Sequence, residues 1–198
     1  LIPCRGVVKS NWKPIVQQAA PETLSGASDV IEIARSFWKV EFEFELPKQE
    51  DYDVILSFLA DRNGSDFSFT SPRHFRRLPR DKSITSDAGI TLNAVNIAHR
   101  TVRLGGVGTG MARRGDMVSY RTLANGYWIG IATADAAPVG GVVTIPVWPE
   151  PMTPHASAPS PRRIDALGEF KLKPNTEPRW SEKGRRRSVS FTAKQVVR

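Results

Sequence analysis

Three glutamates, Glu41, Glu43 and Glu45, have the spacing in this sequence that comes closest to a chemical site. Neighbouring carboxylates can transfer protons or bind a metal ion. Successive side chains of a strand point to opposite faces, and these glutamates alternate with large apolar residues. The carboxylates are therefore expected on the face opposite the apolar side chains. This pattern predicts a solvated or subunit-facing surface rather than an acid–base pair.

Nucleophilic or metal-assisted catalysis finds little support in the remaining residues. Cys4 is the one cysteine, which excludes an internal disulfide and a cysteine metal cluster. The histidines His74, His99 and His155 lie in unrelated contexts, and no Ser-His-Asp order, zinc-ligand spacing or Glu-x-x-His motif occurs. We therefore predict that the protein is not an enzyme and has no catalytic residue, metal ligand or cofactor. The Cys4 thiol is interpreted as structurally incidental.

The glycine-rich run from Gly105 to Gly110 invites comparison with a phosphate-binding loop. Such a loop follows a buried strand, opens a helix and carries a Lys followed by Ser or Thr. The run leads instead into residues 111–116, which have no helical pattern. It predicts a flexible turn rather than a nucleotide site.

The net charge of +8 points to an acidic partner, either nucleic acid, an acidic membrane or an acidic protein surface. Most of the excess lies in residues 161–198, which hold eleven basic and four acidic side chains. Trp180 and Phe191 flank the arginine run of this segment, as aromatic residues do in single-strand binders. No recognition module surrounds the run, so an acidic protein neighbour is favoured and nucleic-acid binding stays open. The candidate interface residues are Arg73, Arg76, Arg77 and Arg80, Arg185, Arg186 and Arg187, with Glu41, Glu43 and Glu45 as possible counterparts on a neighbour.

The elements that position these residues begin with an alternating strand from Phe37 to Leu46, which Pro47 ends. Residues 48–62 follow the apolar spacing of an amphipathic helix, and a short strand follows over residues 66–70. The predicted core residues are Trp38, Val40, Phe42, Phe44, Ile55, Leu59, Phe67 and Phe191.

The rest of the chain is predicted to contain short strands and loops. The first 35 residues have weak periodicity, with one plausible strand at 30–33, and residues 71–88 read as a long basic loop. Asn125-Gly126 is a strong hairpin signal within a series of short strands. The predicted strands of the second half are 101–104, 117–122, 127–132, 142–147, 168–173 and 188–197, the last two forming a hairpin with a long loop.

These elements predict a mainly β (α+β) fold. Its core would comprise residues 1–88 and 160–198, with a small β-domain inserted at 89–148 and a proline-rich segment at 149–159 that is a linker or an extended crossing segment. No apolar run approaches the roughly 20 residues that cross a bilayer, and the start lacks a secretory apolar region. We expect a soluble protein that is not exported by a cleavable signal, unless one was removed before this chain begins.

The order of these features resembles the tail-tip proteins of long-tailed bacteriophages, of the distal-tail or minor-tail type. The resemblance is carried by Trp12, by the strand of residues 37–44, by the helix of residues 52–64 leading into the aromatic strand 66–69, and by the closing strand 188–193. Two segments of the middle part, residues 114–118 and 145–149, also contribute. The resemblance covers most of the chain in order, except residues 71–100 and the arginine-rich hairpin.

The resemblance implies a tail-tube-like β-sandwich with one flanking helix. Six copies would form a ring around the tail channel, between the tail tube protein and the hub or baseplate protein, and DNA would pass without sequence-specific binding. The protein would be made in the host cytoplasm and reside at the tail tip of the virion, with no membrane partner.

This assembly is physically reasonable, because exposed strand edges become joints in a closed symmetric ring. Residues 71–88 would then be an arm that reaches an adjacent subunit and is ordered on assembly. The second hypothesis is a basic β-barrel protein that binds nucleic acid.

Overall fold

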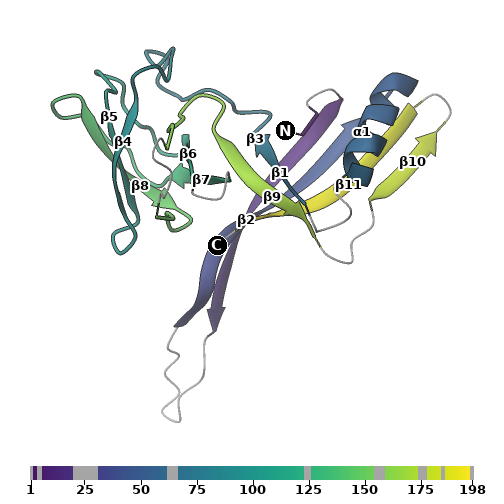
Figure 1. The fold of residues 1–198 in the computed structure, drawn as a ribbon, viewed down its shortest axis with the longest axis horizontal. Coiled ribbons are helices and arrows are strands. Elements are labelled where there is room, and N and C mark those ends of the chain that lie inside the picture. Colours follow the sequence, from purple (N-terminus) through teal and green to yellow (C-terminus); the bar gives the residue numbers. More distant parts are fainter. Residues whose placement is uncertain are drawn as a thin grey trace, which may run out of the picture.

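The computed structural model describes residues 2–3, 6–19, 31–61, 67–122, 126–153, 159–173, 178–183 and 186–196. The fold is mainly β, with one helix and two antiparallel sheets, so the predicted fold class is confirmed. Figure 1 shows the larger sheet with the helix in one half of the molecule and the smaller sheet in the other.

The larger sheet combines strands from both ends of the chain. In spatial order they are β1 (Val7–Ala19), β2 (Ile31–Glu45), β11 (Arg186–Gln195), β9 (Leu167–Leu172) and β3 (Ser68–Pro72). Strand β10 (Arg179–Lys183) pairs with the first half of β11, whereas β9 pairs with its last residues, on the edge that faces away from β2.

The alternation of β2 separates a core face from a charged face. Trp38, Val40, Phe42 and Phe44 are buried, and they share one core cluster with Phe191. The rings of Phe44 and Phe191 stack with their centroids 5.7 Å apart. Burying several aromatic side chains of this size dominates the stability of such a sheet. The predicted core is therefore confirmed at these positions.

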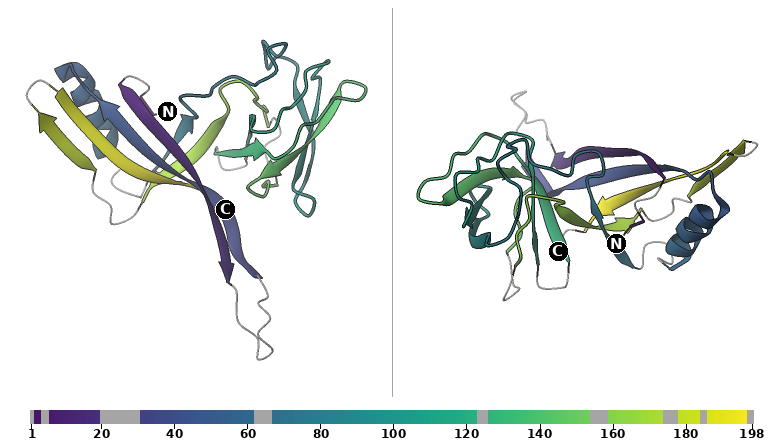
Figure 2. Two further views of the ribbon diagram at one scale, coloured as in Figure 1. Left: turned by 180° about the vertical axis from the view of Figure 1, so that it is seen from behind. Right: turned by 90° about the horizontal axis from the view of Figure 1, so that it is seen from above.

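Helix α1 (Gln49–Asp61) follows β2 directly and covers part of the core face. Pro47 precedes the helix, and Glu50 and Asp51 lie in its first turn, where the helix dipole favours acidic residues. Ile55 and Leu59 are buried in the core cluster, as the apolar spacing predicts. Seen from above in Figure 2, the helix lies on one side of the larger sheet.

The smaller sheet takes all its strands from residues 91–148. In spatial order they are β4 (Thr91–Asn96), β5 (Thr101–Gly105), β8 (Val142–Trp148), β7 (Tyr127–Ala132) and β6 (Met117–Arg121). Strands β6 and β7 pair antiparallel on either side of Gly126, as the hairpin signal predicts, while Asn125 lies outside the described residues. The sheet has its own core cluster around Tyr120, Trp128 and Ile145.

The two sheets meet where β9 contacts β6 and β7. Met117 and Ile129 of the smaller sheet belong to the core cluster of the larger one. Gln195 also links the two sheets, since its amide nitrogen donates to the Ile129 carbonyl oxygen at 3.2 Å while its amide oxygen accepts from the Trp38 amide at 3.2 Å. The chain therefore forms a continuous structure across the two sheets.

Residues 149–153, the described first part of the proline-rich segment, pack against the smaller sheet. The carbonyl oxygen of Glu150 accepts a hydrogen bond from the Trp128 indole at 3.0 Å, and that of Met152 accepts one from the Tyr120 hydroxyl. Met152 is itself buried. These contacts fix this part of the segment to the smaller sheet.

Several elements differ from the sequence-based expectation. Strands β1, β4 and β10 were not predicted, because their composition is mixed and has no clean alternation. Phe67 was predicted in the core but is 55% exposed, because it precedes the paired part of β3 and Phe69 takes the buried position. The predicted hairpin of the last two strands is interrupted by β10, which is the true hairpin partner of β11.

Candidate interface

The basic loop between β3 and β4 is fixed by a buried carboxylate. Asp116 is 2% exposed and accepts hydrogen bonds from the backbone amides of Arg80 and Arg113, both at 2.9 Å. The Arg76 guanidinium lies 4.0 Å from the same carboxylate. A buried carboxylate needs such partners, because an unpaired one carries a large desolvation cost.

The other arginines of this loop also have partners within the chain. Arg77 donates to Asp165 at 2.6 Å, in an ion pair that is half exposed on both sides. Arg73 is half-buried and lies 3.9 Å from the Met117 sulfur. Burial, together with the nearby Arg76 charge, lowers the pKa of Arg73.

His74 lies inside this loop and packs against the core. Its ring contacts the Phe42 ring edge-on, with centroids 5.9 Å apart, and lies 3.3 Å from the Ser71 hydroxyl. Burial, with a smaller contribution from the Arg77 charge, lowers the pKa of His74 to about 4. The histidine is therefore neutral near pH 7.

Two aspartates attach the rest of the loop. Asp81 accepts from the Met111 amide at 2.8 Å, and Asp87 accepts from the amides of Arg163 and Ile164 at 3.1 and 3.0 Å. The hydrogen bond from the Ser83 hydroxyl is the main reason that the pKa of Asp81 falls to about 2. Residues 71–88 thus pack on their own chain, which differs from the expected arm that becomes ordered on assembly.

The arginine run near the C-terminus is also partly used within the chain. Arg187 donates to Glu182 at 2.8 Å, bonds to Gln49 and lies over the Tyr52 ring at 5.3 Å. The Glu182 carboxylate raises the pKa of Arg187. Arg186 is paired through its backbone to β10, and Arg185 lies outside the described residues.

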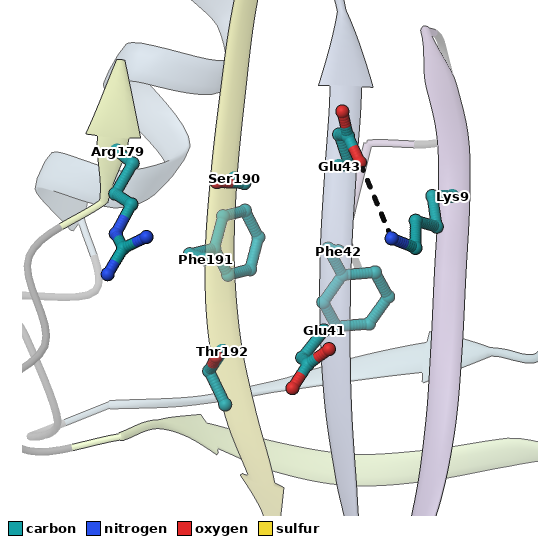
Figure 3. Close-up of a pocket in the computed structure, with 8 residues that line it drawn as sticks. All are labelled: Lys9, Glu41, Phe42, Glu43, Arg179, Ser190, Phe191 and Thr192. Atoms are coloured by element: carbon teal, nitrogen blue, oxygen red, sulfur yellow. Dashed lines mark ion pairs between the residues drawn. The ribbon is translucent and has the colours of Figure 1, made fainter.

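The glutamate face of β2 is partly neutralised by its neighbour β1. Glu41 lies 3.0 Å from the Lys13 ammonium and 3.4 Å from that of Lys39, and Glu43 lies 4.0 Å from that of Lys9. The hydrogen bond from Lys13 is the main cause of the lowered pKa of Glu41. Figure 3 shows the Lys9–Glu43 pair beside a shallow hollow on this face.

The strand register brings Lys13 and Lys39 into one line with two further lysines across the same face. Lys13 is opposite Lys39, Lys39 is opposite Lys194, and Lys194 is opposite Lys171. We call these four residues the lysine row. Directly opposite residues of neighbouring strands are about 5 Å apart, so the row spans four strands over about 14 Å.

The row places like charges beside one another, which costs stability unless anions lie near. Glu41 accompanies Lys13 and Lys39, whereas no described carboxylate forms an ion pair with Lys171 or Lys194. The Lys194 ammonium lies 5.9 Å from the centre of the Phe37 ring, a contact that holds the cation without neutralising it. This end of the row is therefore an electropositive surface.

The positive charge without a described ion-pair partner does not lie where the sequence predicted it. The predicted arginines Arg73, Arg76, Arg77 and Arg187 contact groups of their own chain. The lysine row was missed because its members come from four strands far apart in the sequence. For Lys39, Lys171 and Lys194 the available signal was their place at polar positions of alternating segments, and for Lys13 in β1 there was none. Only the register aligns the four.

Other kinds of site have no support in the described residues. The described histidines, cysteines and acidic residues form no group of three that could hold a metal ion. The glycine run forms a turn, where Gly106 has a φ of +69° and a Cβ there would lie 2.2 Å from the Gly89 carbonyl oxygen. The described part of the chain contains no helix that is long and apolar enough to span a membrane. Comparison of the sequence with family models and with characterised proteins gave no match.

Proposed function

We propose that this protein is a structural subunit that works by assembling with copies of itself. More particularly, it forms a ring at the tip of a long phage tail, between the tail tube protein and the hub or baseplate protein, and DNA passes through the ring. The resemblance of the sequence to distal-tail and minor-tail proteins supports the second, narrower statement. The first is supported by one feature of the fold.

That feature is a two-stranded arm. Strand β11 pairs with β2 only as far as Lys39, so among the described strands residues 31–37 of β2 pair with β1 alone. Figure 1 shows this end of β1 and β2 projecting away from both sheets. A two-stranded ribbon is marginally stable in water by itself. Val16, which is 47% exposed on this arm, is an apolar side chain that a neighbour would cover.

The edge of the larger sheet supports the same reading. Strand β1 has 13 residues and is an edge strand whose one partner in the described part of the chain is β2, so its outer backbone groups face away from the sheet. Long exposed edges pair readily with other chains, and closed rings use such edges repeatedly. Pro14 and the lysines of β1 limit indiscriminate pairing, as they do on other natural edge strands.

The test is the size of the native particle. Native mass spectrometry and negative-stain electron microscopy of the purified chain should show closed rings of six copies, if necessary after addition of tail tube protein. Val16→Asp on the arm should reduce the ring population, whereas Val139→Asp, at an 82% exposed position in the connection between β7 and β8, should not. A wild-type chain that stays monomeric with both tube and hub proteins present would exclude this function.

Nucleic-acid binding is the second candidate, and the lysine row is the observation that favours it. Four lysines in a line can contact several phosphates, and such binding weakens steeply as salt increases. The interleaved acids Glu41, Glu43 and Glu45 count against it, because they repel a phosphate backbone. Titration of oligonucleotides at rising salt tests this candidate. Tight binding by a monomer, with a steep salt slope, would replace the ring with a nucleic-acid function.

A further inference from the structure

We propose that the acidic outer face of helix α1 in one copy docks on the lysine row of the next copy. This inference rests on the proposed function and adds the contact that would join neighbouring subunits. It uses two surfaces of the same chain with opposite charge, similar length and positions on opposite sides of one sheet.

The first surface is the face of α1 that points away from the core. With Ile55 and Leu59 buried, the helical period places a set of exposed residues on the opposite side. They are Glu50, Asp53, Val54, Ser57 and Asp61. This acidic helix face carries three carboxylates and no basic residue, and Val54 is 52% exposed. Its length, at 1.5 Å per residue, is about 16 Å.

The second surface is the lysine row, which spans about 14 Å. Its Lys171–Lys194 end has no described ion-pair partner, so an acidic group placed there would relieve the like-charge contact. Phe37 lies beside Lys194 on this face and provides apolar area next to the charges. The two surfaces therefore have opposite charge and similar length, and each has an apolar residue beside its charged residues.

The positions of the two surfaces suit a repeating contact. Helix α1 lies on the core side of the larger sheet, as Figure 2 shows, whereas the lysine row lies on the opposite side. The carboxylates of the helix therefore cannot reach the lysine row of the same copy. A contact between two different patches is a head-to-tail contact. It gives a closed ring when repeating the rotation between neighbouring copies returns to the first copy.

A second copy suits this row better than a nucleic acid does. The two rows next to the lysine row on this face each contain an acid, since Glu41 and Glu43 lie two and four residues from Lys39 along β2. A phosphate backbone has only negative charge and would be repelled by those rows. A protein surface can present carboxylates to the lysines and apolar or polar groups elsewhere.

The experiment uses two charge-reversed variants of the full chain. The helix variant is Glu50→Lys with Asp53→Lys, and the row variant is Lys171→Glu with Lys194→Glu. Each variant alone would bring like charges together at every joint, so assembly should need at least about tenfold higher protein concentration. An equimolar mixture restores opposite charges at every joint of an alternating ring, and the assembly concentration should return to near the wild-type value.

The control for the row variant is Lys82→Glu with Arg103→Glu, which makes the same change in net charge at exposed positions away from the face. This control should assemble like the wild type. Circular dichroism and thermal melting show whether each variant is folded, and the mixture provides a second check, because a misfolded variant cannot be rescued by mixing.

The outcomes separate this contact from the ring itself. If the wild type forms rings and both variants do so at unchanged concentrations, or if folded variants fail even when mixed, the helix-to-row contact is wrong while the ring stands. If the wild type forms no ring with any tail partner, both proposals fail. If the monomeric wild type binds a 20-nucleotide DNA and the row variant does not, the occupant of the row is nucleic acid and the contact is overturned.

Discussion

The basic loop, whose arginines lie within residues 73–80, and the lysine row are both positively charged, but their charged groups have different surroundings. The loop holds its arginines against groups of the same chain, above all through the buried Asp116. The lysine row lies on an open sheet face, where its Lys171–Lys194 end has no described ion-pair partner. Clustering in the sequence is therefore a poor guide to which charges are available to another molecule. Arginine fits the enclosed role because its planar guanidinium bonds in several directions, while lysine remains a hydrated point charge on a flexible stem.

The largest expected effect comes from removing the anchor of the loop. Asp116→Ala would remove the acceptor of the Arg80 and Arg113 amides and the carboxylate that lies 4.0 Å from the Arg76 guanidinium. Loss of a buried, multiply bonded carboxylate should lower the free energy of unfolding by about 3 kcal/mol. Urea denaturation followed by tryptophan fluorescence measures this change.

The matched comparison is Arg77→Ala, which removes a half-exposed ion pair with Asp165 from the same loop. Exposed pairs contribute little, so the expected loss is below about 1 kcal/mol. Equal losses of unfolding free energy for the two variants would mean that Asp116 does not hold the loop. The loop would then be no more fixed to its own chain than the lysine row is.

A smaller effect is expected from pH, through His74. The pKa of His74 is about 4 in the folded chain and near 6.5 when exposed, chiefly because of burial. Between these pH values the unfolded chain binds more protons, so stability rises with pH and this contribution is complete above about pH 6.5. For the wild type, the free energy of unfolding should fall from pH 7 to pH 4 by more than it does for the His74→Gln variant. The extra fall should be on the order of 2 kcal/mol.

The pKa of His74 can be measured directly from an NMR titration of its ring signals. A loop that packs on its own chain gives a pKa well below the usual range of histidine. A value near 6.5 would mean that the loop is a solvated arm, as the sequence alone suggests, and would remove the contrast with the lysine row.

The smallest effect is expected at the lysine row. Lys171→Gln with Lys194→Gln removes two adjacent like charges from opposite positions of β9 and β11. The isolated chain should gain about 0.5 kcal/mol of stability at low salt, and the gain should disappear near 1 M salt, where charges are screened. Thermal melting at several salt concentrations measures it. A loss of stability at low salt would show that contacts of these lysines within the chain, such as that of Lys194 with Phe37, outweigh the like-charge repulsion.

Local patterns in the sequence predicted much of the fold. Alternation predicted the core face of β2, apolar spacing predicted α1, and the Asn125-Gly126 pair predicted the β6–β7 hairpin. These features depend on neighbouring residues, whose geometry is set by the period of the element. The missed strands β1, β4 and β10 have mixed composition without clean alternation, so no local pattern marks them. Their place at sheet edges is not the reason, because β3 and β6 are also edge strands and were predicted.

The candidate interface was less predictable. The sequence by itself determined that β2 has an apolar face and a charged face, because side chains alternate along any strand. Only the tertiary structure decided which charges remain open, because hydrogen bonds and strand register act between residues far apart in the chain. Register turned Lys13, Lys39, Lys171 and Lys194 into one row, and burial turned the basic loop into part of the protein's own framework.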